Sequence, residues 1–334
     1  MSFKYNKILV IGSNSFTGSS YIDFALNKSC KLVGISRSRE YNKVMLPYKS
    51  NPFLDKFKFY KLDVNKHINK ILEIIDSFKP EVVINFSAQG EVRNSWKFPE
   101  HWYTTNCLSI VKLTNALVKR KFIKRYISIS TPEVYGTTNK RLLDSNFYNP
   151  STPYAASKLA GDLHLNTLLK KYNFPVVFSR SANVYGPHQQ LYRIIPRTII
   201  YLKMRKKIKL HGKGKSKRSF IHIKDVVEAI HRIIKFGKIG EVYHVAPKAN
   251  EISIYKIVKL ICNIMGYDFN LCVKLISENY GQDEVYKLNS KKIRDLNNWS
   301  EQISLKDGIN ETIEWVNFNW EIIKKMPLEY LHKV

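Results

Sequence analysis

A short apolar run followed at once by a turn of small residues constrains the fold of this chain more than any other stretch. Residues 7–11 read Lys-Ile-Leu-Val-Ile, which is typical of a strand buried on both faces of a sheet. The turn from Gly12 to Gly18 follows directly, and a helical pattern begins near Thr17. Further strands are expected at 31–37, 57–62, 82–86, 125–129 and 175–181, with helices near 67–78, 100–121 and 153–171. This alternation predicts an α/β fold built on a doubly wound parallel sheet.

The turn after the first strand resembles the dinucleotide fingerprint of a Rossmann fold. In that fingerprint, glycines permit a tight turn and let a pyrophosphate approach the backbone at a helix N-terminus. The matching residues here are Gly12, Ser15, Phe16 and Gly18, and Ser15 stands where the extended pattern has its middle glycine. Backbone approach at this point is therefore either relaxed or rebuilt around a small side chain.

The end of the second strand indicates which nicotinamide dinucleotide binds. An acidic residue there bonds the ribose 2′-hydroxyl of NAD, whereas an arginine accommodates the 2′-phosphate of NADP. Ser36 and Arg37 occupy this region, which favours NADP over NAD unless Arg37 is only a solvated charge. The remaining expected cofactor contacts are Asp63, Val64, Phe86, Ser87, Ala88 and Asn106.

Tyr154 and Lys158 lie four residues apart on a helix that Pro153 can open, so the two side chains share a face. A tyrosine hydroxyl with a pKa of about 10 is a poor base at neutral pH until a nearby cation favours its anion. Lys158 can be that cation. Taken alone, such a pair is more often a packed ring and a solvated charge.

Two further motifs accompany this pair. They are Ser-Thr-Pro-Glu-Val-Tyr-Gly at residues 130–136 and Asn-Val-Tyr-Gly-Pro at residues 183–187. Together the three motifs resemble the extended short-chain dehydrogenase/reductase family, and within it the nucleotide-sugar 4,6-dehydratases of carbohydrate biosynthesis. The resemblance implies an NAD(P)-binding Rossmann domain, mainly residues 1–180. It also implies a smaller α/β substrate-binding domain, mainly residues 181–334, with some segments returning to the Rossmann sheet. The expected assembly is a homodimer.

The resemblance also implies roles for four catalytic residues. Tyr154 takes the proton of the sugar C4 hydroxyl, and Lys158 lowers the tyrosine pKa and bonds the nicotinamide ribose. Thr131 hydrogen-bonds the reacting oxygen. Glu133 removes the C5 proton, water leaves from C6, and the hydride returns there, so the tightly bound NAD(P) is regenerated in each turnover.

Pro132 departs from the dehydratase pattern. Related enzymes carry an aspartate or a serine at this position, the aspartate helping to protonate the departing hydroxyl, and proline can take neither part. Glu133, a water molecule or another side chain can donate that proton instead. Alternatively, the reaction is a 4-epimerisation or a decarboxylation that uses the same 4-keto intermediate. A different class of function is a catalytically silent protein that binds sugar nucleotides.

The expected partner is a nucleotide-diphosphate sugar, and the candidate contacts are Gln89, Asn183, Arg193 and Arg218. Arg218 matches the family's arginine that pairs with the diphosphate, and a guanidinium fork suits phosphate oxygens. Asn183 and Arg193 either join it or are structural. The segment 279–283 stands where relatives carry a further arginine near the nucleotide.

Composition and sequence patterns also bear on whether the chain binds nucleic acid, a membrane or a metal ion. Lys and Arg outnumber Asp and Glu by 55 to 27, but the lysines are scattered and lack the interleaved aromatic residues of a nucleic-acid platform. No apolar run approaches the length of a membrane span. The four cysteines lack metal-ligand spacing, so no metal site is expected. With no signal-peptide pattern at the start, we expect a cytoplasmic protein that binds neither nucleic acid nor membrane.

Overall fold

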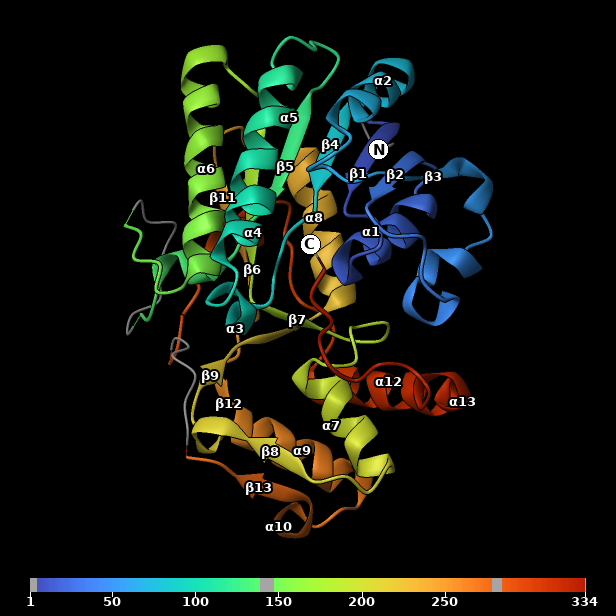
Figure 1. The fold of residues 1–334 in the computed structure, drawn as a ribbon, viewed down its shortest axis with the longest axis vertical. Helices are drawn as coiled ribbons and strands as arrows, with labels where there is room; N and C mark the ends of the chain where they lie inside the picture. Colours follow the sequence, from blue (N-terminus) through green and yellow to red (C-terminus); the bar gives the residue numbers. More distant parts are fainter. Residues whose placement is uncertain (1–4, 139–146, 278–283, 334) are drawn as a thin grey trace.

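A seven-stranded parallel sheet dominates the structure, a computed structural model that describes residues 5–138, 147–277 and 284–333. The strand order is β11-β6-β5-β4-β1-β2-β3 (Figure 1). The strands are β1 (Lys7–Ile11), β2 (Lys31–Ser36), β3 (Phe57–Lys61), β4 (Val82–Asn85), β5 (Arg125–Ile129), β6 (Val176–Ser181) and β11 (Val242–Val245). The order reverses between β1 and β4, and open α/β sheets bind ligands beyond the carboxyl ends of the strands at such a point. The predicted doubly wound parallel sheet is confirmed.

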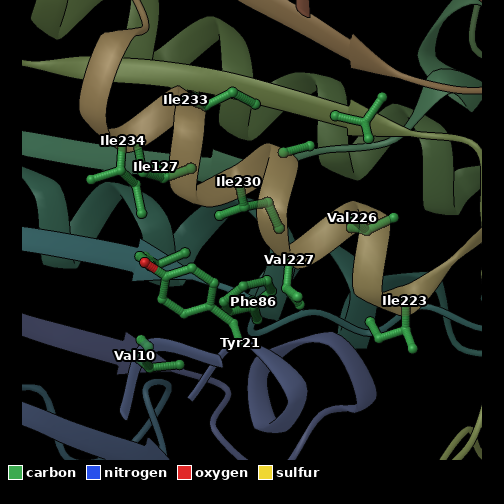
Figure 2. Close-up of a cluster of buried hydrophobic side chains, with 14 of the residues drawn as sticks. Val10, Tyr21, Phe86, Ile127, Ile223, Val226, Val227, Ile230, Ile233 and Ile234 are labelled. Carbon is green, nitrogen blue, oxygen red and sulfur yellow. The ribbon is translucent and has the colours of Figure 1, made fainter. Parts of the chain in front are cut away.

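Helices cover both faces of this sheet, which explains why its strands β1, β2 and β4 are buried along almost their whole length. Ile8 and Val10 of β1 point into a core with α1 (Phe16–Leu26) and α8 (Ile223–Phe236). Leu9 and Ile11 point into a second core on the opposite face. The helices of that opposite face are α2 (Ile68–Phe78), α5 (Ser109–Leu117) and α6 (Pro153–Tyr172). Figure 2 shows the isoleucines of α8 gathered with Val10, Tyr21 and Phe86 in the first core.

The helix expected over 100–121 is interrupted. It consists of α4 (Pro99–Tyr103), a π-helical turn η4 (Thr104–Leu108) and α5, which ends at Leu117. A π turn inserts an extra residue into the helical register and therefore re-aims the side chains within it. Asn106 lies in this turn and is fully buried. Gly161 of α6 packs against it so closely that a Cβ there would lie 2.4 Å from the Asn106 carbonyl oxygen.

The second half of the chain forms a smaller lobe below the sheet in Figure 1. Its short strands pair as β7 (Asn183–Tyr185) with β10 (Phe220–His222), β9 (Lys217–Arg218) with β12 (Ile252–Ser253), and β8 (Ile208–Leu210) with β13 (Val273–Leu275). Its helices include α7 (Ile194–Lys203), α9 (Ile254–Met265), α10 (Phe269–Cys272), α12 (Leu305–Phe318) and α13 (Trp320–Ile323). A separate hydrophobic core joins α7, α9 and α12. Two segments of this half, α8 and β11, belong to the large sheet and its helical cover.

The structure also bears on membrane-spanning helices, disulfide bonds and metal-binding clusters. Within the described ranges, no helix combines the length and the apolar character that a membrane crossing needs. Cys30, Cys107, Cys262 and Cys272 are all free thiols. Over the same ranges, no cluster of three histidine, cysteine or acidic side chains is arranged to hold a metal ion.

Candidate active site

A cavity of about 940 Å³ lies at the carboxyl edge of the sheet, and residues from both halves of the chain line it. Sixteen of the predicted site residues line this cavity: Gly12, Ser15, Phe16, Ser36, Arg37, Asp63, Val64, Phe86, Ser87, Ala88, Gln89, Thr131, Glu133, Tyr154, Asn183 and Arg193. Gly18, Asn106, Lys158 and Arg218 do not line it. The sequence motifs thus converge on one cavity although up to 181 residues separate them along the chain, from Gly12 to Arg193.

The glycine turn is shaped for close approach of a ligand to the backbone. Gly12 has a φ of +84°, and a Cβ there would lie 2.6 Å from the Ser87 nitrogen. A Cβ on Gly18 would lie 2.5 Å from the Gly12 carbonyl oxygen, so the turn closes only with glycine at both positions. Ser15 caps α1, because its Oγ accepts a hydrogen bond of 3.1 Å from the Gly18 N–H. Ser15, which replaces the middle glycine of the fingerprint, therefore stabilises the turn by capping α1.

The end of β2 offers hydrogen-bonding groups to a bound ribose. The Ser36 Oγ accepts a hydrogen bond of 2.9 Å from the Asn14 N–H. The Asn14 Nδ2 donates to the carbonyl oxygens of Ser38 and Arg39. The Asn14 Oδ1 is buried at the cavity and has no hydrogen-bond partner in the described part of the chain. A buried acceptor without a partner is costly, so a ligand hydroxyl there would stabilise it. Together with the glycine turn, this end of the cavity fits a dinucleotide.

Asn106 acts from behind the cavity wall. Its Oδ1 accepts from the Gln89 N–H at 2.9 Å, and its Nδ2 donates to the Gln89 carbonyl oxygen and to the Ser157 Oγ at 3.0 Å each. Asn106 thereby fixes the backbone of the residues that follow β4 and ties it to α6. Asn106 does not itself line the cavity but supports Gln89, which does; its predicted contact with the cofactor stays a prediction.

Thr131 and Tyr154 are the predicted catalytic residues that follow β5 and begin α6. Thr131 follows β5 and caps the 3₁₀ turn η5 (Pro132–Tyr135), where its Oγ1 accepts from the Glu133 N–H at 3.3 Å. The Thr131 and Tyr154 side chains both line the cavity. Pro132 is the first residue of η5, a position where its missing N–H leaves no bond unmade. The start of this 3₁₀ turn therefore accounts for a proline at position 132, which the comparison with dehydratases does not explain.

Burial shifts the pKa values of Tyr154 and Lys158 in opposite directions. Burial raises the pKa of Tyr154 above its usual range and the neighbouring Glu133 raises it further, whereas the Thr131 hydrogen bond and Arg193 act in the opposite direction. Burial lowers the pKa of Lys158, and Asp162 opposes this shift. The Lys158 Nζ donates to the Ile129 carbonyl oxygen, at the end of β5, at 2.7 Å. Stabilisation of the tyrosinate by Lys158 stays a prediction.

The residues predicted to hold the sugar nucleotide differ in their placement. Arg193 is exposed at the start of α7 and lines the cavity. The Asn183 Oδ1 accepts a hydrogen bond of 2.8 Å from the Tyr286 hydroxyl. Arg218 is buried, and its Nη1 donates to the carbonyl oxygens of Lys217 and Glu284. Its role at a diphosphate stays a prediction. The segment 279–283 lies outside the described residues.

A buried ion pair between Asp162 and Arg180 was not predicted from the sequence. The Asp162 Oδ2 accepts from the Ser130 Oγ at 2.5 Å and from the Arg180 Nη2 at 2.9 Å. The Arg180 guanidinium lies over the rings of Tyr135 and Tyr148, at 5.0 and 5.1 Å from their centroids. One signal was available, because Asp162 lies four residues after Lys158 and therefore on the same face of α6.

A second missed feature is the segment 327–333, which we call the strap. Five of its residues line the cavity: Pro327, Glu329, Tyr330, Leu331 and Lys333. Nothing in its sequence pattern sets it apart from an ordinary polar segment, so only the structure brings it to the site.

Fold and site define a class of protein, namely an α/β protein with a dinucleotide-type glycine turn and a tyrosine-lined cavity at the carboxyl edge of a parallel sheet. The model of the NAD dependent epimerase/dehydratase family matches residues 8–246. The chain belongs to this family, and the resemblance predicted from its motifs is confirmed.

Individual relatives include both dehydratases and epimerases. The dTDP-D-glucose 4,6-dehydratase of Homo sapiens is 32% identical over 279 residues, which cover 80% of this chain and 78% of the human protein. The solved dTDP-glucose 4,6-dehydratase of Bacillus anthracis in complex with NAD has a TM-score of 0.84 at 26% identity, covering 95% of this chain and 98% of that one. The UDP-glucuronic acid 4-epimerase of Bacillus cereus, in complex with UDP-glucuronic acid and NAD, has a TM-score of 0.81 at 26% identity, with coverages of 93% and 99%.

Proposed function

We propose that the protein is a nucleotide-sugar 4,6-dehydratase that resembles the dTDP-glucose enzymes. The observation that carries the proposal is the convergence of Thr131, Glu133 and Tyr154 on one cavity. A hydroxyl pair next to a carboxylate supplies both a proton acceptor for C4 oxidation and a base for C5. The similarity to the human dehydratase supports the same reaction.

In this proposal, each protein group moves or holds one proton. Tyr154 accepts the proton of the C4 hydroxyl, and Thr131 hydrogen-bonds the same oxygen. The nicotinamide, when bound, supplies hydride acceptance from C4 and hydride return to C6. The ketone acidifies C5, so Glu133 removes the C5 proton and the C6 hydroxyl departs as water. Since Pro132 carries no ionisable group, Glu133 returns its newly acquired proton to that leaving hydroxyl.

A second candidate is a nucleotide-sugar 4-epimerase. Pro132 favours it, because the position that assists elimination in dehydratases is apolar here, and the family likeness extends to an epimerase of Bacillus cereus. Such an enzyme needs Tyr154 and Lys158 and has no use for a base at Glu133. The decarboxylase alternative shares the 4-keto step and is tested by the same experiment, as is a silent binding protein.

The deciding experiment incubates the protein with dTDP-, UDP-, GDP- and CDP-hexoses and UDP-glucuronic acid in deuterated water and follows the masses of the products. Dehydration removes the mass of one water molecule and adds one solvent deuterium. Epimerisation by the direct route changes neither, and decarboxylation removes carbon dioxide. Loss of water with deuterium uptake supports the dehydratase. The absence of any reaction with bound dinucleotide refutes the enzyme proposal and favours the silent protein.

The finer choice of cofactor is part of the proposal. The family is NAD dependent, and the expected preference for NADP rests on Arg37, which lines the cavity after β2. The Arg37 Nη1 already donates to the Lys333 carbonyl oxygen at 3.1 Å, so a 2′-phosphate would compete with that bond. Titration with both dinucleotides decides between them. An Arg37→Ala variant that binds NADP as tightly as the unaltered protein removes the argument for NADP.

The division of labour and the assembly are proposed in the same terms. Residues 1–180 mainly bind the dinucleotide, and residues 181–334 mainly bind the sugar nucleotide. Tyr103, Leu108 and Leu163 are between 43% and 47% exposed around α4, η4 and α6, which supports a homodimer through these helices. A Leu163→Lys variant should elute as a monomer when the unaltered protein elutes as a dimer, and an unchanged mass excludes this face.

A further inference from the structure

The strap bonds side chains that follow the two strands on either side of β1. A single carbonyl oxygen, that of Lys333, accepts hydrogen bonds from the Arg37 Nη1 at 3.1 Å and from the Gln89 Nε2 at 2.7 Å. Arg37 follows β2 and Gln89 follows β4, and β1 lies between these two strands in the sheet. A residue bonded to both neighbours therefore spans the end of β1, where Gly12 begins the predicted pyrophosphate turn.

Stacked rings anchor the strap to α4. The His332 ring lies parallel to Phe98, His101 and Trp102, with centroid distances of 5.3, 5.1 and 5.2 Å and interplanar angles of 4°, 13° and 7°. The His332 Nε2 also lies 2.8 Å from the His101 Nδ1, which is one hydrogen bond with a single shared proton. Three stacked partners and a hydrogen bond make His332 the principal attachment of the strap to the sheet lobe.

The strap is attached to the smaller lobe as well. Glu329 lies 3.3 Å from Arg197 and accepts a hydrogen bond of 3.1 Å from the Tyr201 hydroxyl, both on α7. The Tyr330 ring packs edge-on against Tyr192 at 5.3 Å. The strap therefore bridges the two lobes over the cavity and returns from α13 toward the sheet in Figure 1.

We propose that the strap is a retaining element that closes over the bound dinucleotide and sets how slowly it leaves. The inference rests on the proposed dinucleotide site. A dinucleotide seated on the glycine turn between β2 and β4 leaves through the mouth that the Lys333 contacts span, so release requires the strap to lift. Retention suits a reaction that restores its cofactor in every turnover, because no exchange with solution is needed.

The first test measures release of NADH, or of NADPH if that binds more tightly, from the purified full chain by stopped-flow fluorescence. His332→Ala removes the stack and the hydrogen bond, and we expect release to accelerate about tenfold or more, equivalent to about 1.4 kcal/mol. His332→Phe keeps a ring in the stack and loses only the hydrogen bond. Its release rate should therefore lie between those of the unaltered protein and of His332→Ala. His211→Ala, an exposed histidine on the smaller lobe, is the matched control and should leave the rate unchanged.

The second test locks the strap. His101→Cys and His332→Cys together, oxidised to a disulfide, should slow release at least tenfold, and a reducing agent should restore the original rate. Each single variant serves as a control for the native cysteines. Equal release rates in locked, reduced and His332→Ala proteins overturn the inference. Failure of the dehydratase proposal looks different, because the dinucleotide then binds and responds to the strap while no sugar nucleotide reacts.

Discussion

The buried Asp162/Arg180 pair permits a quantitative prediction. Asp162 is 2% exposed and Arg180 is 1% exposed, and the guanidinium lies over the rings of Tyr135 and Tyr148. In an Asp162→Asn variant, the amide oxygen still accepts the Ser130 hydrogen bond, but the arginine charge loses its counter-charge. Breaking a buried pair by removing one partner costs about 3–5 kcal/mol in the free energy of unfolding.

This cost converts into a shift of the thermal midpoint. With an unfolding entropy of about 2.1 cal/mol/K per residue, a chain of 334 residues has about 0.7 kcal/mol/K, so 4 kcal/mol lowers the midpoint by about 6 °C. The variant should also alter catalysis. Asp162 opposes the lowering of the Lys158 pKa by burial, so its loss lowers that pKa further and moves the alkaline limb of the activity profile to lower pH.

Thermal and denaturant unfolding measure the first effect, and a pH profile of turnover measures the second. The matched control is the double variant Asp162→Leu with Arg180→Met, which removes both charges and keeps apolar volume. It should be more stable than Asp162→Asn, since no charge remains buried alone. If the double variant is the less stable of the two, then packing and not charge dominates, and the reasoning is wrong.

Three further predictions address the site and the fold. Glu133→Gln should still transfer hydride from C4, seen as reduced-cofactor absorbance, while deuterium exchange at C5 stops; unchanged dehydration removes Glu133 from its role. Tyr154→Phe should lower kcat by about 10²–10⁴-fold with dinucleotide affinity retained in a fluorescence titration, and near-normal turnover assigns the base elsewhere. Burial lowers the pKa of His222 to about 4, below its unfolded value of about 6.5, so the unfolded state binds more protons as pH falls. Stability should therefore drop by about 2 kcal/mol between pH 7.5 and pH 5, and a His222→Gln variant should show a smaller drop in acid denaturation.

Much of this architecture can be predicted from short stretches of the sequence. A strand buried on both faces needs apolar residues on both of them, so the apolar run in residues 7–11 predicts both the strand and its central place in a parallel sheet. Residues that line the cavity follow the strands directly, which is why the sequence alone predicts Gly12, Arg37 and Thr131 at one edge of the sheet.

The features that escaped prediction depend on contacts between distant residues. The Gln89 to Lys333 hydrogen bond joins residues 244 apart, and no periodicity encodes such a meeting. The π turn at Thr104–Leu108 was also missed, because its residues fit an ordinary helix equally well. Packing against Gly161 of α6 accompanies the wider turn, and that partner lies more than fifty residues downstream.

The placement of β11 at the edge of the large sheet bears on how the protein emerges during synthesis. β11 pairs with β6, and α8 supplies much of the core against α1, yet both come after the first strands of the smaller lobe. A nascent chain that has reached residue 180 therefore carries an unpaired strand edge at β6 and an uncovered apolar face on α1. The sheet is complete only after residue 245 has been made, so residues 1–180 cannot complete the large sheet ahead of the rest of the chain.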